Sequence, residues 1–391
     1  MREIVIAGAG LGEFTADVMR AVNEADTVFA DSRFADRIPA GKNVADIRDF
    51  REIDGMTGKI LLLVSGDPGV FSLLPVIKRR YPGENIRVLP GISSLQAICA
   101  NAGETWHDAA IISGHGRNLS AGKFLNTVER NRVTVLFCDK NISPSWACEK
   151  LSCISGVDVV IGSCLGGNNE RIFRGSPESF SSQNFPELSI ILIRNKNPYT
   201  PARLFLRDSD FLREPDIVMT NESVRSVILS RLEMGGDSVL WDIGAGTGSI
   251  SVTAGNIFPF SEIHAVDYNP KSAGLISRNA EKFHLHNITV HNSRALDVID
   301  GLPAPTHVFI GGAGGELSGI LPRITAMNRP ARVVIACVTL ETLTEAYTFL
   351  RDRENFGAVQ VSASSSKVIA PSLTMMKAAN PVTILSAGHT V

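Results

Sequence analysis

Short runs of aliphatic and β-branched residues alternate along this chain with longer segments in which apolar residues recur at helical spacing. This alternation predicts an α/β architecture built on a largely parallel sheet. Uninterrupted apolar runs such as residues 60–64 are typical of strands covered on both faces. The strands predicted in the first half are Ile4–Ala7, Ile60–Val64, Ile86–Leu89, Ala110–Ser113, Val133–Cys138, Asp158–Ile161 and Leu188–Ile193, with helices over Thr15–Asn23 and Ser93–Asn101.

The pattern starts again after Asn195–Pro201, a polar segment with two prolines that we interpret as a linker. Beyond it we predict a helix over Glu222–Leu232, capped by Thr220 or Asn221. The serine cluster Ser362–Ser366 is expected to form a loop. The strands predicted in the second half are Ser238–Asp242, Glu262–Asp267, Ile288–His291, Thr306–Ile310, Arg332–Ala336, Val359–Ser362 and Val382–Leu385.

Length and composition agree with two globular domains. At roughly 100–200 residues per domain, the chain of 391 residues divides at the linker into residues 1–200 and 201–391. Its hydrophobic content of 44% excludes a disordered chain. Lys and Arg number 38 against 40 Asp and Glu, so the chain lacks the basic excess that neutralises phosphates. We therefore expect no nucleic-acid partner.

Three further classes of feature are absent from the sequence. No apolar run approaches the ~18 residues of a membrane span, so we expect a soluble cytoplasmic protein with no membrane contact. The six cysteines form no C-x-x-C pair and are interpreted as reduced thiols. None of the eight histidines lies in an H-E-x-x-H motif or beside cysteine at ligand spacing, so no metal is expected.

The sharpest motif is a glycine loop in the second half, VLWDIGAGTGSIS, which contains Gly244, Ala245, Gly246, Thr247 and Gly248. Glycines permit a tight turn and a close ligand, and the helix that follows offers free N–H groups. Asp267 ends the next strand, where a carboxylate can accept hydrogen bonds from ribose hydroxyls. The G-x-G-x-G spacing, preceded by Asp242, resembles the class I S-adenosylmethionine (SAM) methyltransferases. A dinucleotide loop and a purely structural turn are the alternatives.

Two loops downstream are candidate walls of the same pocket. Asn292–Asp297, which includes Ala295, follows a strand at the place where the related methyltransferases contact adenine. Gly311–Gly315 contains four glycines and also follows a strand, where ligands bind in α/β sheets. Thr220, Ala295 and Gly311 complete the predicted cofactor residues of the second half. A flexible turn is the alternative interpretation of the glycine run.

The first half carries glycine loops of a different kind. They follow four predicted strands at Gly8–Gly12, Val64–Gly69, Leu89–Ser94 and Ser113–Arg117. Loops rich in Gly, Pro and Ser at successive strand ends predict one crevice at the edge of a sheet. A nicotinamide site would need an acidic residue at the end of the second strand, and Asp31 keeps that alternative open.

The motifs of these loops resemble a known family. V-S-G-D-P-G followed by P-G-I-S-S is similar to the tetrapyrrole methylases, and S-G-H-G-R with L-G-G-N-N-E-R-I-F to their corrin-pathway C-5 branch. In the second half, M-T-N-E-S-V-R, D-I-G-A-G-T-G, F-I-G-G-A-G-G and V-T-L-E-T resemble the C-15 methylase and decarboxylase. The order of both halves resembles the fused decarboxylating precorrin-6Y methyltransferases of cobalamin biosynthesis.

This resemblance implies a two-lobed first domain for C-5 methylation and a class I methyltransferase domain for C-15 methylation and decarboxylation. It implies two SAM sites and a reduced tetrapyrrole substrate. In the first domain, SAM would bind against two loops. The residues assigned to it there are Gly66, Asp67, Pro68, Ile92, Ser93 and Ser94.

The substrate implied by the resemblance carries several carboxylates, which arginine binds bidentately. Arg117 and Arg225 lie in family-like motifs and are candidate substrate contacts. His115 is a candidate donor to a substrate carboxylate, with a turn-stabilising role as the alternative. Thr339 and Glu341 are candidates to face the substrate, and Glu341 could instead cap the next helix.

Two positions depart from the family pattern. Leu11 stands where the family usually has proline, which puts the activity of the first site in question. Ala245 replaces a frequent cysteine and should be neutral. The alternative function is a two-domain SAM methyltransferase acting on another small molecule or on RNA, with the first domain a scaffold. Because both related families form oligomers, a homo-oligomer is expected.

Overall fold

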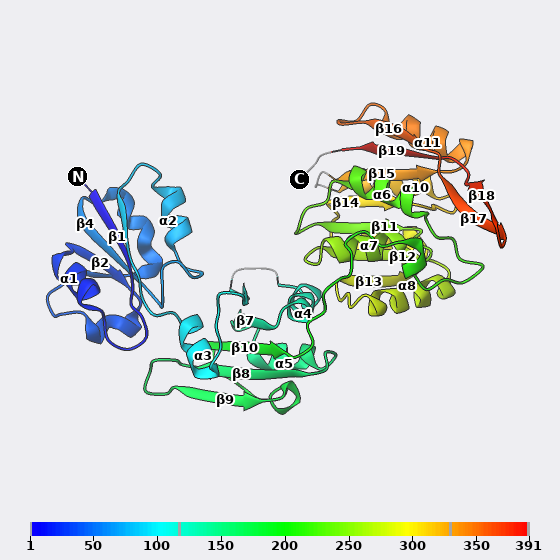
Figure 1. The fold of residues 1–391 in the computed structure, drawn as a ribbon. Helices are drawn as coiled ribbons and strands as arrows, with labels where there is room; N and C mark the ends of the chain where they lie inside the picture. The colour runs from blue at the N-terminus through cyan, green and yellow to red at the C-terminus, as the bar shows by residue number, and fades with distance from the viewer. Residues whose placement is uncertain (1, 116–118, 328–330, 389–391) are drawn as a thin grey trace. The chain divides into compact units, whose positions relative to one another are not determined.

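The structure is a computed structural model that describes residues 2–115, 119–327 and 331–388 (Figure 1). It divides into two compact units. The first comprises Met1–Leu119 with Asn131–Pro198, and the second comprises Ser120–Arg130 with Tyr199–Val391. Among the described residues, no helix is both long and apolar enough to cross a membrane.

The first sheet of unit 1 is entirely parallel, as the sequence predicted. Its strands, in the order β3-β2-β4-β1-β5, are β3 (Val44–Asp46), β2 (Thr27–Ala30), β4 (Gly58–Val64), β1 (Arg2–Gly8) and β5 (Ile86–Leu89). Helix α1 (Ala16–Glu24) covers one face through Val18 and Val22, and α2 (Leu74–Arg80) covers the other through Ile77. Both faces are therefore buried, which explains the continuous apolar strands.

The second sheet of unit 1 is mostly antiparallel, so the expectation of a largely parallel sheet was wrong there. Its order is β6-β7-β10-β8-β9, with β6 (Ala110–Ser113), β7 (Val133–Phe137), β10 (Ser189–Asn195), β8 (Val157–Ser163) and β9 (Arg171–Gly175). Only β6 and β7 pair in parallel. The short link from β8 to β9 cannot hold the crossover that parallel neighbours need. Helices α3 (Ser94–Ala102) and α5 (Pro144–Leu151) belong to this half of the unit.

Unit 2 contains a seven-stranded sheet whose third strand precedes the glycine loop Gly244–Gly248. The order is β13 (Ile288–Asn292), β12 (Glu262–Asp267), β11 (Val239–Ile243), β14 (His307–Ile310), β15 (Arg332–Cys337), β19 (Val382–Ala387) and β16 (Gly357–Val361). Only β19 runs antiparallel to its neighbours. The carboxyl ends of β11, β12, β14 and β15 therefore share one edge.

Helices cover both faces of this sheet, as predicted for an α/β domain. Helices α6 (Glu222–Leu232) and α7 (Ser249–Ile257) pack on one face, and α10 (Leu317–Ala326) and α11 (Leu340–Leu350) on the other. Helices α8 (Pro270–Lys282) and α9 (Ala295–Val298) complete the covering layer. The prediction of α6 is confirmed, and its cap is Asn221, whose side chain accepts the Ser223 N–H at 2.9 Å.

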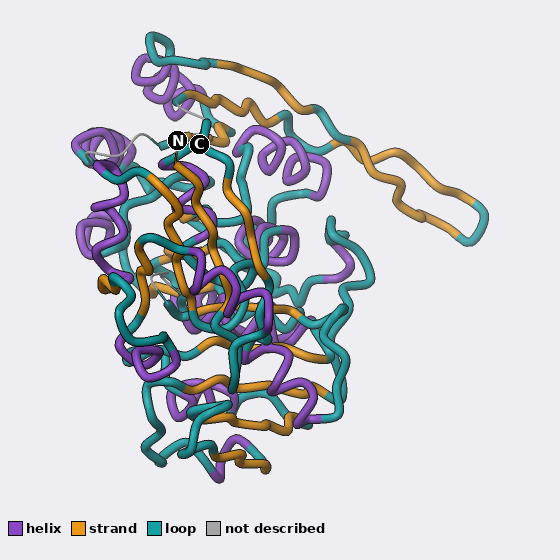
Figure 2. The backbone as a smooth tube through the Cα atoms, turned by 90° about the vertical axis from the view of Figure 1, so that its left-hand side faces the viewer, coloured by secondary structure: helices purple, strands orange, loops and turns teal. Residues whose placement is uncertain are grey.

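The expected serine loop is instead the start of a β-hairpin. Strands β17 (Ser364–Ala370) and β18 (Leu373–Ala378) pair only with each other and extend away from the rest of unit 2 (Figure 2). The loop expectation was wrong because serines line one end of a strand whose other end, Val368–Ile369, is apolar.

Helix α4 (Ala121–Arg130) packs within unit 2, although the sequence analysis placed these residues in the first domain. The Asn126 side chain donates to the Pro259 carbonyl at 2.8 Å and accepts the His286 N–H at 2.8 Å. Glu129 is hydrogen-bonded to His284 at 2.6 Å. These contacts join residues about 130 to 160 positions apart, which a local pattern cannot predict.

Candidate cofactor sites

The glycine loop of unit 2 follows the strand–loop–helix order that its sequence predicted. Strand β11 ends at Ile243, and α7 begins directly after Gly248. Gly244, Gly246 and Gly248 have φ angles of +74°, +57° and +76°, in the left-handed region that favours glycine. The turn therefore depends on glycine at three alternate positions and leaves the N-terminus of α7 beside the loop.

Two other loops approach the glycine loop so closely that side chains would not fit. A Cβ atom on Gly244 would overlap the carbonyl oxygen of Gly312, and one on Gly246 would lie 2.6 Å from the Val218 carbonyl oxygen. The Gly311 N–H donates to the Ile243 carbonyl at 2.9 Å, and the Thr247 N–H donates to that of Val218 at 3.2 Å. The predicted residues Gly244, Gly246 and Gly311 thus lie together in one cradle of backbone.

Asp267 ends β12 at the edge of this cradle. Its two carboxylate oxygens accept the N–H groups of Gly246 at 2.8 Å and Asn269 at 2.9 Å. Because a carboxylate has about four acceptor positions, each oxygen keeps a lone pair for a ribose hydroxyl. The Ser293 N–H donates to the Asp267 main-chain carbonyl at 3.2 Å. This bond brings the predicted adenine wall, with Ala295 in the first turn of α9, next to Asp267.

Two buried polar atoms beside the glycine loop have no hydrogen-bond partner among the described residues: Asp242 Oδ1 and Thr247 Oγ1. The other Asp242 oxygen accepts both the N–H and the hydroxyl of Ser251, at 3.0 and 2.5 Å. Buried polar groups are normally paired. The backbone cradle and these two atoms therefore fit a ligand with its own polar groups, as the amino-acid end of SAM has. The sequence analysis noted Asp242 beside the loop but did not assign it to the cofactor, and the unpaired oxygen now makes it a candidate site residue.

Three loops converge in the same way at the carboxyl edge of the first sheet of unit 1. A Cβ atom on Gly8 or on Gly91 would overlap the carbonyl oxygen of Gly66. The Asp67 carboxylate joins two of these loops, because Oδ1 accepts the Gly69 N–H at 2.7 Å and Oδ2 accepts the Gly91 N–H at 3.1 Å. The predicted residues Gly66 and Asp67 therefore lie together at one strand edge.

The second cofactor loop of unit 1 combines exposed and structural residues. Ile92 is 56% exposed and available to a ligand. Ser93 is buried and caps α3, with its hydroxyl accepting the Gln96 N–H at 3.3 Å, and Ser94 is the first residue of that helix. Pro68 is buried in the loop that Asp67 organises. Ser93 thus acts on the loop through its cap on α3.

The position that departs from the family pattern has a defined neighbour. A Cβ atom on Gly166, in the β8–β9 loop, would lie 2.6 Å from the Leu11 Cβ atom. Leu11 therefore packs against the glycine turn of L-G-G-N-N-E-R.

Asp31, the residue that kept the nicotinamide alternative open, is paired with Arg33 at 2.9 Å, and this hydrogen bond lowers the pKa of its carboxyl.

Comparison with known proteins assigns each half of the chain. The tetrapyrrole (corrin/porphyrin) methylases match residues 3–180, and a precorrin methyltransferase domain matches residues 212–388. A precorrin-6Y C(5,15)-methyltransferase [decarboxylating] from Sinorhizobium sp is 31% identical over 287 residues, which cover 72% of this chain and 69% of that protein. The chain belongs to this precorrin-6Y methyltransferase family.

Other members of the corrin pathway match parts of the chain. A probable cobalt-precorrin-6B C(15)-methyltransferase (decarboxylating) from Pyrobaculum calidifontis is 35% identical over 194 residues, 49% of this chain and 97% of that protein. The solved structure of precorrin-6Y C5,15-methyltransferase from Geobacter metallireducens is 34% identical and has a TM-score of 0.43. The matched region covers 48% of this chain and 96% of the Geobacter chain.

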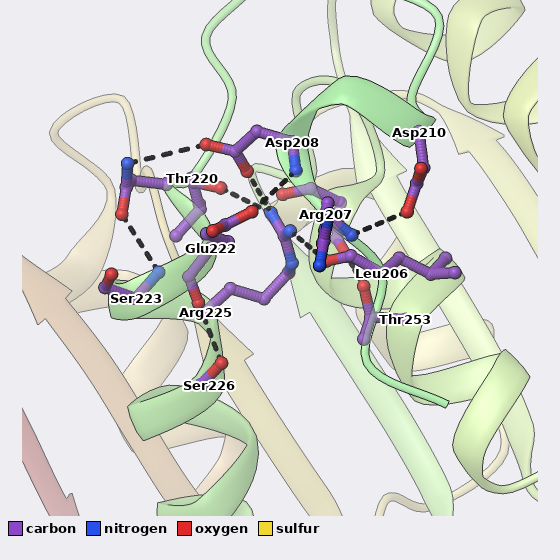
Figure 3. A network of polar contacts seen from close by, with 12 residues as sticks. Leu206, Arg207, Asp208, Asp210, Thr220, Glu222, Ser223, Arg225, Ser226 and Thr253 are labelled. Atoms are coloured by element: carbon purple, nitrogen blue, oxygen red, sulfur yellow. Dashed lines mark hydrogen bonds and ion pairs between the residues drawn. The ribbon is translucent and has the colours of Figure 1, made fainter. Parts of the chain in front are cut away.

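Arg225 was predicted to contact the substrate of this family, and the structure corrects that interpretation. Its side chain is 2% exposed and forms an ion pair with Asp208 at 3.0 Å (Figure 3). The guanidinium also donates to the carbonyls of Thr220 and Leu206, each at 2.7 Å. A buried cation with three acceptors is committed to the fold. Arg225 therefore holds the segment 206–220, whose Val218 carbonyl meets the glycine loop.

Thr220 was assigned to the cofactor by resemblance and lies in that same segment. It is half-buried, and its carbonyl oxygen accepts the Arg225 guanidinium. Since Val218, two residues earlier, contacts the glycine loop, the position of Thr220 is coupled to the cradle.

Of the remaining predicted residues of the family site, Thr339 and Glu341 belong to unit 2 and His115 to unit 1. Thr339 caps α11 by accepting the Thr342 N–H at 3.3 Å, so the suggestion that Glu341 caps this helix was wrong. Glu341 is exposed and lines a groove of about 720 Å³ between α10 and α11. His115 is exposed, and its N–H donates to the Ser113 hydroxyl at 3.2 Å. Arg117 lies outside the described residues.

No group of three or more His, Cys, Asp and Glu side chains suited to a metal ion occurs within residues 2–115, 119–327 and 331–388.

Asp242 should make the stability of this chain depend on pH. Burial raises the pKa of its carboxyl from 3.8 to about 6, against the lowering effect of the Ser251 hydrogen bonds. Between these values the folded chain holds a proton that the unfolded chain has released. We therefore expect the free energy of unfolding to fall by about 3 kcal/mol as pH rises from about 4 to about 6, and then to level off.

Urea unfolding of Asp242→Asn and the parent across this pH range measures the effect as the difference between the two profiles. The exposed Asp216→Asn variant should keep the parent's profile and serves as control. Parallel profiles for Asp242→Asn and the parent would contradict the assignment to Asp242.

Proposed function

We propose that this chain methylates a precorrin at carbons 5 and 15 with SAM and removes CO₂ from an acetate side chain, within corrin-ring biosynthesis. The observation that carries the proposal is the 31% identity to a decarboxylating precorrin-6Y methyltransferase over 72% of the chain. The two glycine cradles, one in each unit, support it because each methyl transfer needs a cofactor site.

We assign the C-5 transfer to the first domain and the C-15 transfer with decarboxylation to the second. The match of the tetrapyrrole methylases to residues 3–180 and of a precorrin methyltransferase domain to residues 212–388 supports this division. In the first domain SAM would lie against Gly66, Asp67 and Ile92. In the second it would lie across Gly244–Gly248, with Asp267 at the ribose.

The proposed methyl transfers require little from the protein beyond the binding of its ligands. SAM supplies an electrophilic methyl group on a sulfonium. Meso carbons of a reduced tetrapyrrole are electron-rich enamine positions, so no strong general base is required to make the nucleophile. The chain's own contribution is to align the two ligands and to exclude water. The backbone cradles serve this alignment, since hydrogen bonds within the chain hold their loops in place before a ligand arrives.

We further propose that the chain acts as a homo-oligomer. The hairpin β17–β18 supports this, because an isolated two-stranded hairpin is marginally stable in water. Val368 and Met376 on it are 69% and 63% exposed. The partner in the reaction is the reduced tetrapyrrole, and the compartment is the cytoplasm. The net charge of −2 supports the absence of a nucleic-acid partner.

Calorimetric titration with S-adenosylhomocysteine, the product of SAM, tests this proposal. We expect two sites per chain. A single site would contradict the two-centre assignment and favour the alternative in which the first domain is a scaffold. Absence of binding would overturn the methyltransferase function, and titration with NADH would then test the nicotinamide alternative.

A further inference from the structure

Arg294 and Glu316 form an ion pair at the carboxyl edge of the unit 2 sheet, where Arg294 Nε donates to Glu316 Oε1 at 2.7 Å. Arg294 comes directly after Ser293, whose N–H donates to the Asp267 main-chain carbonyl at 3.2 Å. Glu316 comes directly after the glycine run Gly311–Gly315, which packs against the glycine loop of the cradle. Because β12 and β11 lie between β13 and β14 in the sheet, the ion pair joins the loops on either side of the proposed cofactor cradle.

The ion pair leaves most donors of the Arg294 guanidinium available. Arginine carries five N–H groups in a planar fork, and the bond to Glu316 uses the one on Nε. Within the described residues, neither Nη atom of Arg294 has a hydrogen-bond partner. The Arg294 side chain is 65% exposed, whereas that of Glu316 is 18% exposed. Glu316 therefore holds one edge of the guanidinium, and the two Nη atoms can donate to a carboxylate through two parallel N–H bonds.

Arg294 is also the cation that the loops at this edge of the sheet provide. The parallel strands β13, β12, β11, β14 and β15 all end there. The loops directly after them, all within the described residues, are Gly244–Gly248, Tyr268–Asn269, Ser293–Arg294, Gly311–Glu316 and Val338–Thr339. Arg294 is the one Lys or Arg in these loops. An anionic group that reaches these loops would therefore be paired by Arg294.

We propose that Arg294 binds a carboxylate of the tetrapyrrole in unit 2 and so positions the ring for methyl transfer. This inference rests on the proposed function, in which the substrate carries several carboxylates. SAM also carries a carboxylate, but its amino-acid end fits the buried oxygens of Asp242 and Thr247 that have no partner among the described residues. Its adenosine end, proposed to lie beside Asp267, carries no carboxylate. Because arginine binds a carboxylate bidentately, the contact would fix the orientation of the ring as well as its position.

The first test uses the full chain without substitution and measures each arginine separately. Phenylglyoxal modifies exposed guanidinium groups, and peptide mass spectrometry follows the rate at each residue. The probe is uroporphyrin, a stable porphyrin octacarboxylate, which at about ten times its dissociation constant should slow the modification of Arg294 about tenfold. Arg323, which is 42% exposed and pairs with Asp300 at 3.0 Å, should react at an unchanged rate. S-adenosylhomocysteine alone should protect neither arginine.

The second test compares three variants with the parent by calorimetric titration with uroporphyrin. Because both units act on the tetrapyrrole in the proposed function, the parent should have two sites. In Arg294→Gln one of these sites should bind about tenfold more weakly, since charge-assisted hydrogen bonds are lost. Glu316→Gln keeps an acceptor for Nε and removes a negative charge, so it should bind at least as tightly as the parent. Arg323→Gln removes the same charge elsewhere in unit 2 and should bind as the parent does.

The outcomes separate a substrate contact from a structural role. If Arg294 only held the two loops together, Arg294→Gln and Glu316→Gln would break the same ion pair and lose affinity equally, which would overturn the proposal. Protection of Arg294 by S-adenosylhomocysteine, or none by uroporphyrin in a chain that binds S-adenosylhomocysteine, would also overturn it. A parent chain that binds neither ligand would overturn the proposed function itself. If Arg294→Gln fails to fold, the protection experiment still decides, because it needs no substitution.

Discussion

Replacing Gly244 by alanine should abolish cofactor binding in the second unit and leave that of the first unit intact. The φ angle of +74° is unfavourable for alanine, and the new Cβ atom would overlap the backbone of Gly312. Neither loop can retreat easily, because the Gly311 N–H is bonded to the Ile243 carbonyl in the adjoining strand. Calorimetry should therefore show one S-adenosylhomocysteine site per chain in place of two, with the affinity of the lost site at least about 100-fold lower.

Gly274→Ala is the matched control for this change. Gly274 lies inside α8, and a Cβ atom there would have nothing within 4 Å. Alanine in a helix interior stabilises by about 0.5–1 kcal/mol relative to glycine, so this variant should bind at both sites and unfold at a slightly higher temperature. Two intact sites in Gly244→Ala would show that the glycine loop of unit 2 does not bind the cofactor.

Arg225→Met should destabilise the second unit by about 3 kcal/mol and weaken cofactor binding there. Breaking one side of a buried ion pair leaves its partner uncompensated, and here the change also removes donors from the carbonyls of Thr220 and Leu206. The segment 206–220 would loosen, and with it the bond from the Val218 carbonyl to the glycine loop. Urea unfolding measures the first effect, and S-adenosylhomocysteine titration measures the second, expected at about tenfold.

Arg213→Met is the control that shows whether the effect of Arg225→Met comes from the loss of a buried guanidinium or from the loss of a positive charge near Asp208. Arg213 faces the same Asp208 at 3.8 Å, but its side chain is 55% exposed. Exposed pairs contribute about 0–1 kcal/mol, so this variant should resemble the parent in both measurements. Equal destabilisation by Arg213→Met and Arg225→Met would contradict the role assigned to the buried guanidinium.

The sequence analysis located the strands, helices and loops whose positions are determined by residues close together in the chain. The strand Glu262–Asp267 and the helix Glu222–Leu232 begin and end where the hydrophobic pattern predicted. The glycine loops also follow strands as expected, since glycine at φ near +70° is a requirement of the turn itself. By contrast, β3 was missed, because a strand of three residues is too short to show a period.

The site residues also differ in whether neighbouring residues in the sequence indicate their role. Glycines and Asp267 could be predicted as site residues because each stands at a strand end, which the neighbouring residues reveal. Arg225 was misassigned, because nothing in M-T-N-E-S-V-R indicates that the side chain is enclosed by Leu206 and Asp208. Asp242 was not assigned, since its significance lies in a buried oxygen that has no hydrogen-bond partner among the described residues.

The sequence by itself determined the α/β class, the two-domain order and the membership of each half in its family, because periodicity and motifs are carried by residues close together in the chain. The tertiary structure alone decided three things: which loops meet, which charges are buried and which strands pair in opposite directions. Gly66 meets Gly91, Arg225 meets Asp208, and β10 pairs against β7 and β8. Each of these depends on contacts between distant residues, whose burial and partners no local pattern records.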